Sequence, residues 1–134
     1  MDKATRELIE GLIAKAHEKL AVAQTLLAET EFYDDVASRA YYAAFHAAQA
    51  LLKSEGLEGH THRGVASLFG LHFARAGRIP GKFGRYLNNL KDDRESGDYD
   101  LYSGIDRAAA QNAVREAQEF LEEAERYLKP LLSE

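Results

Sequence analysis

The sequence predicts an all-α protein, an antiparallel up-and-down helical bundle of four long helices and one short helix. Residues that favour helices, above all alanine, leucine, glutamate, lysine and arginine, are abundant along the chain. Apolar residues recur at spacings of three and four, and the period-2 alternation of strands is missing. Because amphipathic segments cannot bury their apolar faces alone, we expect them to pack into a single domain over residues 1–134.

The first two helices are expected over residues 3–29 and 34–55, with Gly56 stopping the second. The first carries one apolar stripe, made of Leu8, Ile9, Leu12, Ile13, Ala16, Leu20, Ala23 and Leu27. The second is apolar or small over most of its circumference, which predicts a buried, central helix.

A third helix is expected over residues 63–76, with Thr61 as its N-cap. Pro80 and Gly81 break the chain before a short helix over 82–91. By its composition, the stretch that follows looks like a solvated linker.

The last helix is expected to begin near Gly104, with Ser103 as its N-cap and Asp106 three residues on. Pro130 is expected to mark its end, because proline cannot continue a helix.

Composition and charge limit the classes of function. The chain is 46% hydrophobic and 29% charged, has no cysteine, and carries no apolar run of membrane-spanning length or secretory signal pattern. We therefore expect a cytoplasmic protein without membrane association. The net charge of −5 argues against a generally basic nucleic-acid coat, yet residues 60–94 hold seven Lys and Arg against two Asp, or +5. This segment is either an anion-facing surface or ordinary surface charge that clusters.

A polar strip on the second helix contains Arg39, Tyr42 and His46 at helical spacing. In a buried helix such a strip must be hydrogen-bonded internally or line a cleft. The three side chains therefore form either an internal network or the floor of an anion or nucleotide site.

His60, His62 and His72 do not have the spacing of a metal site, so loop or helix-cap roles are expected for them and no metal is predicted. Glycine-rich phosphate loops and nucleophile motifs are also missing from the sequence. No cofactor is implied.

Three segments resemble the HEPN domain, especially its small stand-alone prokaryotic members. They are Ser-Arg-Ala-Tyr-Tyr-Ala-Ala-Phe-His-Ala-Ala at 38–48, His-Arg-Gly-Val at the start of 62–69, and Arg-Glu-Ser-Gly-Asp-Tyr at 94–99. The resemblance spans nearly the whole chain. It implies a helical bundle that forms a homodimer and is often encoded beside a minimal nucleotidyltransferase, many such pairs being toxin and antitoxin.

In those pairs the HEPN member is a metal-independent ribonuclease with an Arg-x4-6-His motif, and two copies of the motif line a cleft at the dimer interface. By position, Arg94 matches the motif arginine, while Tyr99 occupies the slot of the histidine. Asp98 is a further candidate for nucleotide or RNA binding. His46 would join Arg94 in a composite site if the fold brought them together. Relatives adenylylated on a tyrosine near the motif make Tyr99 and Tyr102 candidates for modification.

Three functions are thus open for this sequence. One is a nucleotide- or RNA-binding component of a two-gene nucleotidyltransferase–HEPN system. Another is an active endoribonuclease toxin with a variant Arg/Tyr site, in which tyrosine, with an ordinary pKa near 10, would replace imidazole. The last is a non-catalytic dimeric interaction module in which Arg94 pairs with Asp98 or with an acid of the last helix.

Overall fold

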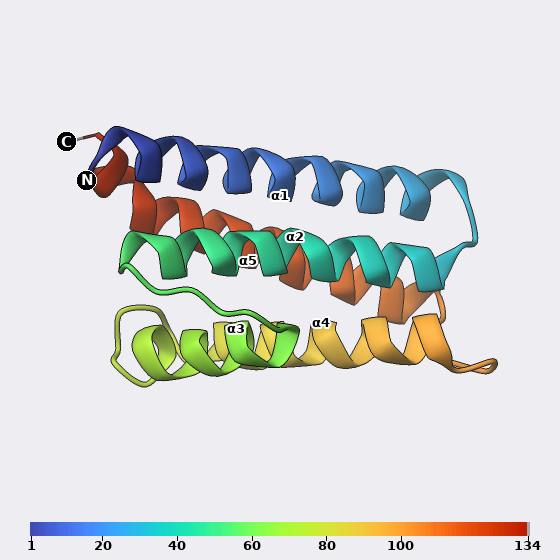
Figure 1. The fold of residues 1–134 in the computed structure, drawn as a ribbon. Coiled ribbons are helices and arrows are strands. Elements are labelled where there is room, and N and C mark those ends of the chain that lie inside the picture. The colour runs from blue at the N-terminus through green and yellow to red at the C-terminus, as the bar shows by residue number, and fades with distance from the viewer. Residues whose placement is uncertain (134) are drawn as a thin grey trace.

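The predicted all-α bundle is confirmed by a computed structural model that describes residues 1–133. Figure 1 shows long helices aligned along one axis, with the start of the first helix and the end of the last helix together at one end of the bundle. The elements are α1 (Lys3–Glu29), α2 (Tyr33–Ser54), α3 (His62–Phe69), the π-helical η1 (Gly70–Ala74), α4 (Lys82–Tyr99) and α5 (Arg107–Leu132). Within residues 1–133, each helix is too short or too polar to cross a membrane.

Helix α2 is the centre of the bundle, as the sequence predicts. It packs against α1, α3, α4 and α5, and in Figure 1 it lies between α1 and the layer of α3 and α4. Its small residues are completely buried, namely Ala37, Ala40, Ala43, Ala44, Ala47, Ala48 and Ala50. Alanine lets neighbouring backbones approach closely at little entropic cost, so four elements can share one helix as their support.

Phenylalanine rings connect the layer of α3, η1 and α4 to α5. The ring of Phe69 lies 5.7 Å from that of Phe73 in a stacked arrangement and 5.2 Å from that of Phe120 on α5. Phe83 of α4 makes an edge contact with Phe120. Such pairs bury large apolar areas. The predicted α1 stripe is also inside, except for Leu8, which is 46% exposed.

Helix α4 is longer than predicted, and this is the main correction to the expected fold. It continues through Tyr99 rather than ending at Lys91, whereas α3 is the short helix, with eight residues before η1. The inward face of α4 runs on past Leu90 to Arg94, which is buried. A charged side chain thus holds a core position, and the apolar periodicity alone could not reveal the last two turns of the helix.

The other helix boundaries differ from the prediction for local reasons. Asp106, rather than Ser103, caps α5, because its Oδ1 accepts the backbone N–H of Ala109 at 2.9 Å. The Ser103 hydroxyl instead donates to Oδ1 of Asp34, tying the α4–α5 loop to α2. Pro130 does not end α5, which reaches Leu132, because an exposed proline in the last turn gives up only one helical hydrogen bond.

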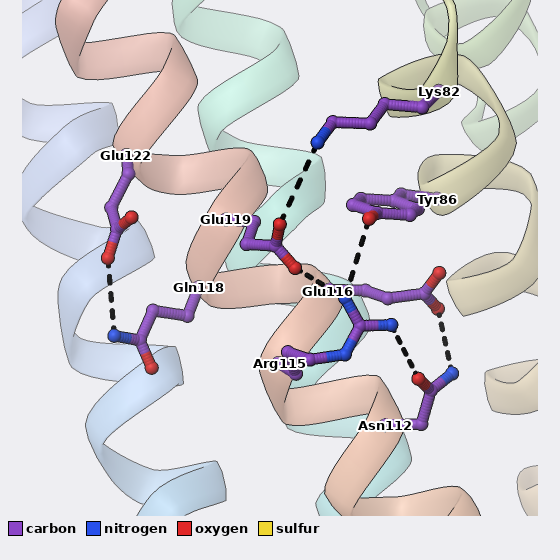
Figure 2. Close-up of polar contacts among 8 residues, drawn as sticks. All are labelled: Lys82, Tyr86, Asn112, Arg115, Glu116, Gln118, Glu119 and Glu122. Carbon is purple, nitrogen blue, oxygen red and sulfur yellow. Dashed lines mark hydrogen bonds and ion pairs between the residues drawn. The ribbon is translucent and has the colours of Figure 1, made fainter.

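Polar contacts link α4 to α5 along their outer edge. Figure 2 shows Arg115 of α5 donating to the Tyr86 hydroxyl at 3.4 Å and Lys82 near Glu119 at 3.9 Å. Glu116 lies between these helices and is only 3% exposed, with the Asn112 amide donating to it at 3.3 Å. Burial raises the pKa of the Glu116 carboxyl above its ordinary value. This carboxylate therefore opposes folding when it is charged.

Replacing Glu116 by Gln is expected to stabilise the protein at pH 7.5, because the amide keeps the shape and removes a buried charge. The folded-state pKa of Glu116 is above the ordinary 4.5, so the wild-type penalty is absent below pH 4.5 and is complete above the folded-state pKa. Melting temperatures of both proteins from pH 4 to 8 check this. The stabilisation should shrink toward pH 4, and a constant difference at every pH would contradict the titration of Glu116.

Candidate functional site

Arg94 forms the centre of a polar and aromatic cluster between α2 and α4. It is 9% exposed, and its guanidinium carbon lies 5.3 Å from the ring centre of Tyr41 and 5.8 Å from that of Tyr42. Its Nη1 donates to Oδ2 of Asp98 at 3.3 Å. Its Nε is buried and has no hydrogen-bond partner among residues 1–133. A buried cation with a free donor is suited to bind an anion.

A histidine completes this cluster from α3. His62 is the first residue of α3, and the Thr61 cap, which accepts the backbone N–H of Gly64 at 2.8 Å, fixes that turn. The His62 ring centre lies 4.5 Å from that of Phe45, and its Nδ1 lies 2.7 Å from the Tyr41 hydroxyl. Tyr41 thus contacts both the guanidinium from α4 and the imidazole from α3. We call Arg94, Tyr41, Tyr42, Phe45 and His62 the Arg94 cluster.

The electrostatics of the cluster fix the charge of each group near neutral pH. Partial burial and the charges of Arg94 and Lys91 lower the pKa of His62 below its ordinary value, so the ring is neutral at pH 7. Burial raises the pKa of Tyr41 well above its ordinary value, so its hydroxyl stays protonated and can donate to Nδ1 of His62. In that tautomer the imidazole proton is on Nε2; in the other, Nδ1–H donates to the Tyr41 hydroxyl and Nε2 is the free acceptor.

Arg94 itself remains a cation. Burial opposes its charge, but neighbouring Tyr42, Tyr99 and Asp98 outweigh this and raise the pKa of Arg94. A permanent cation beside a neutral imidazole and a phenol can bind a phosphate and exchange protons with a ligand. Within residues 1–133, His, Asp and Glu side chains form no group of three or more that could hold a metal ion.

Three of the residues predicted from the sequence gather around Arg94. Asp98 is its ion-pair partner one turn along α4, and Tyr42 lies over its guanidinium. Tyr99 helps to raise the pKa of Arg94. It lies at the end of α4 and is 76% exposed. The structure therefore brings Arg94, Asp98, Tyr99 and Tyr42 together.

The other predicted residues lie at the edge of the cluster or beyond it. His46 contacts the Tyr42 ring but hydrogen-bonds to Gln49 at 3.0 Å, so it stands beside the cluster rather than next to Arg94. Arg39 is exposed and has no recorded contact with the cluster in the described part of the chain. Tyr102 is 90% exposed in the loop between α4 and α5.

The histidine that contacts Tyr41 together with Arg94 is His62, for which only a loop or helix-cap role is expected from the sequence. The Arg-x4-6-His spacing looks for a histidine along α4 or α2, whereas His62 comes from a different helix. The available signal was its place at the start of the His-Arg-Gly-Val segment, one of the three that carry the family resemblance. No spacing rule within one helix could find it.

The three segments of that resemblance meet in space. Tyr41 and Tyr42 belong to the first, His62 begins the second and Arg94 begins the third. The HEPN domain family profile matches residues 9–127. The chain belongs to the HEPN domain family.

Relatives of this chain include proteins named as a putative toxin and as UPF0332 proteins. A Methanocaldococcus jannaschii protein named "Putative toxin MJ0605" is 36% identical over 132 residues, covering 98% of this chain and 97% of the relative. A Gloeobacter violaceus UPF0332 protein is 34% identical, covering 89% of this chain and 94% of the relative. A Thermotoga maritima UPF0332 protein is 30% identical, covering 93% and 94%. These similarities extend over nearly the full length of each relative.

The charge of Arg94 should be measurable in the titration of His62. Replacing Arg94 by Gln removes a nearby positive charge, so the pKa of His62 is expected to rise. Imidazole proton shifts followed by NMR between pH 5 and 8 measure it. Arg107→Gln, an equal charge change on α5, should leave the His62 titration unchanged. If the pKa of His62 in Arg94→Gln equals that of the wild type, the charge of Arg94 does not act on His62 and the prediction is wrong.

Proposed function

We propose that this chain is the nucleotide- or RNA-binding HEPN component of a two-gene system of toxin–antitoxin type, paired with a minimal nucleotidyltransferase. The observation that carries the proposal is the buried guanidinium of Arg94, which lies against the adjacent rings of Tyr41 and Tyr42 and whose Nε has no hydrogen-bond partner in the described chain. A fully hydrogen-bonded structural arginine would leave no donor for a ligand. The name of the Methanocaldococcus jannaschii relative supports the toxin assignment.

The Arg94 cluster offers the two kinds of contact that a nucleotide needs. The guanidinium matches the geometry of a phosphate group. Tyr42, Phe45 and His62 are only half-buried, so a base can stack on their rings. Asp98 holds Arg94 in place, and Tyr99 lies close to its charge. Arg39 and His46 are assigned to the outer part of the same binding surface on α2.

A second copy and the nucleotidyltransferase are the proposed protein partners. Large apolar side chains at the α4–α5 end of the bundle support such contacts, because Tyr99, Leu101 and Tyr102 are 76%, 87% and 90% exposed. The hydroxyls of Tyr99 and Tyr102 are accessible there to a modifying enzyme, which makes these tyrosines the proposed adenylylation sites. The proposed compartment is the cytoplasm.

If Arg94 binds the ligand, Arg94→Lys should weaken nucleotide and RNA binding about tenfold or more, because lysine keeps the charge but loses the planar fork. Arg94→Ala should abolish binding. Isothermal titration with AMP and with a short RNA measures the affinity, and thermal melts monitor folding. Arg107→Ala is the matched control. A large loss of melting temperature with binding intact would favour the purely structural Arg94–Asp98 pair of an interaction module.

The second candidate function is metal-independent RNA cleavage, and the position of His62 favours it. Cleavage through the 2′-hydroxyl requires a base, an acid and a cation near the developing charge on phosphorus. In the tautomer in which Nδ1–H donates to the Tyr41 hydroxyl, the neutral imidazole of His62 has Nε2 free to accept a proton at pH 7, and Arg94 supplies the cation. The variant Arg/Tyr site would then be an Arg/His site assembled from α4 and α3.

A ribonuclease of this kind should arrest growth on expression and cut RNA in the presence of EDTA. His62→Gln should reduce cleavage about 100-fold or more, because general acid–base catalysis contributes on that scale, while RNA binding is kept. His72→Gln is the matched histidine control. A wild-type protein that binds RNA but neither arrests growth nor cuts RNA would leave the binding function alone.

A further inference from the structure

An open groove of about 650 Å³ lies between the α3–η1 segment and α4, next to the Arg94 cluster. Its α3–η1 side is lined by Arg63, Ala66, Ser67, Gly70, Leu71 and Arg75, which follow one another at spacings of one, three or four residues. Its other side comes from α4 and includes Lys91.

Three small residues leave space in the groove. Ala66, Ser67 and Gly70 line the middle of the α3–η1 side, next to the larger Leu71, which is 53% exposed. A Cβ atom added to Gly70 would meet no heavy atom within 4 Å. The space above Gly70 is therefore free for a ligand.

The groove is cationic although the chain as a whole carries −5. Arg63, Arg75 and Lys91 line it, against a single acid in the lining, Asp92. In the described residues neither Arg63 nor Arg75 forms an ion pair, and both are exposed. On other faces, arginines with nearby acids do pair, as Arg78 does with Glu55 at 2.8 Å. Lys91 pairs with Glu95 at 2.8 Å, so the positive charge that has no ion-pair partner along this groove is that of Arg63 and Arg75.

The Arg94 cluster adjoins the groove through neighbouring residues, although its own five residues do not line the groove. Arg63 lines the groove and the preceding residue, His62, belongs to the cluster. Lys91 lies one helical turn before Arg94 on α4, and its charge acts on His62. A chain-like ligand in the groove would therefore continue onto the half-buried rings of Tyr42 and Phe45.

We propose that this groove binds the phosphodiester backbone of a single-stranded polynucleotide, with the neighbouring base placed on the aromatic rings of the Arg94 cluster. Spaced cations leading to stackable rings are the features by which proteins hold single strands. Arg63 and Arg75 are separated by roughly 18 Å of helix, which corresponds to about five stacked nucleotides. The assignment rests on the proposed nucleotide or RNA binding and extends it from a single nucleotide to a strand.

The test compares the double variant Arg63→Gln/Arg75→Gln with wild type, using fluorescein-labelled U12 RNA and, separately, UMP. U12 binding at 50 mM salt should weaken about tenfold, and the salt dependence should become less steep by about 1.4 in log–log slope. UMP binding should be unchanged, because Arg94 is intact. Arg107→Gln/Lys129→Gln on α5 removes the same charge outside the groove and should leave U12 binding unchanged.

A second variant probes the space rather than the arginines. Gly70→Glu places a carboxylate in the open part of the groove, where its Cβ meets no protein atom, and should also weaken U12 binding. The dT12 strand should lose affinity by the same factor as U12 in both variants, because the two share phosphates. A loss confined to RNA would overturn backbone recognition.

The remaining outcomes separate this proposal from the preceding one. Unchanged U12 affinity and salt slope in both groove variants, or a wild type that fails to bind U12, would overturn the groove assignment. Loss of UMP binding in Arg94→Lys would still support the Arg94 site. If the groove variants alter the oligomeric state in gel filtration while U12 binding stays the same, the groove is a protein interface and the proposal is wrong.

Discussion

The burial of α2 on nearly all sides is the constraint on which the rest of the structure depends. Its alanines allow α1, α4 and α5 to approach closely, and its larger residues then face defined neighbours. Tyr41 and Tyr42 therefore present their rings to Arg94 at 5.3 and 5.8 Å. A helix packed on only one face could not have positioned two consecutive tyrosines around a buried guanidinium.

Arg94 occupies a core position that an apolar residue would ordinarily take. Burying a cation costs free energy unless other groups compensate. Here the ion pair with Asp98 and the faces of two tyrosine rings stabilise the buried cation. The Nε atom has no hydrogen-bond partner in the described chain. A buried ion pair often adds little to the stability of a fold. Stability is therefore a weaker explanation for the burial of Arg94 than ligand binding.

Charged groups are paired on one face of the molecule and partly unpaired on another. The outer edge of α4 and α5 is crossed by paired groups such as Arg115 with Tyr86 and Lys82 with Glu119 (Figure 2). The groove beside α3 instead has Arg63 and Arg75 without ion pairs in the described chain, close to His62 and the aromatic rings. This asymmetry gives the 60–94 segment, already basic in the sequence, a physical location next to the site.

The sequence alone determined the helical class and the central place of α2, and it singled out Arg94 as a candidate site residue, because helix periodicity, alanine content and local motifs are properties of neighbouring residues. It misplaced the end of α4, since a buried arginine interrupts the apolar pattern while the helix continues. Only the tertiary structure decided that His62 rather than His46 shares a contact with Tyr41 together with Arg94. That pairing joins helices whose residues are 32 positions apart, and packing across a bundle does not follow from spacing within any one helix.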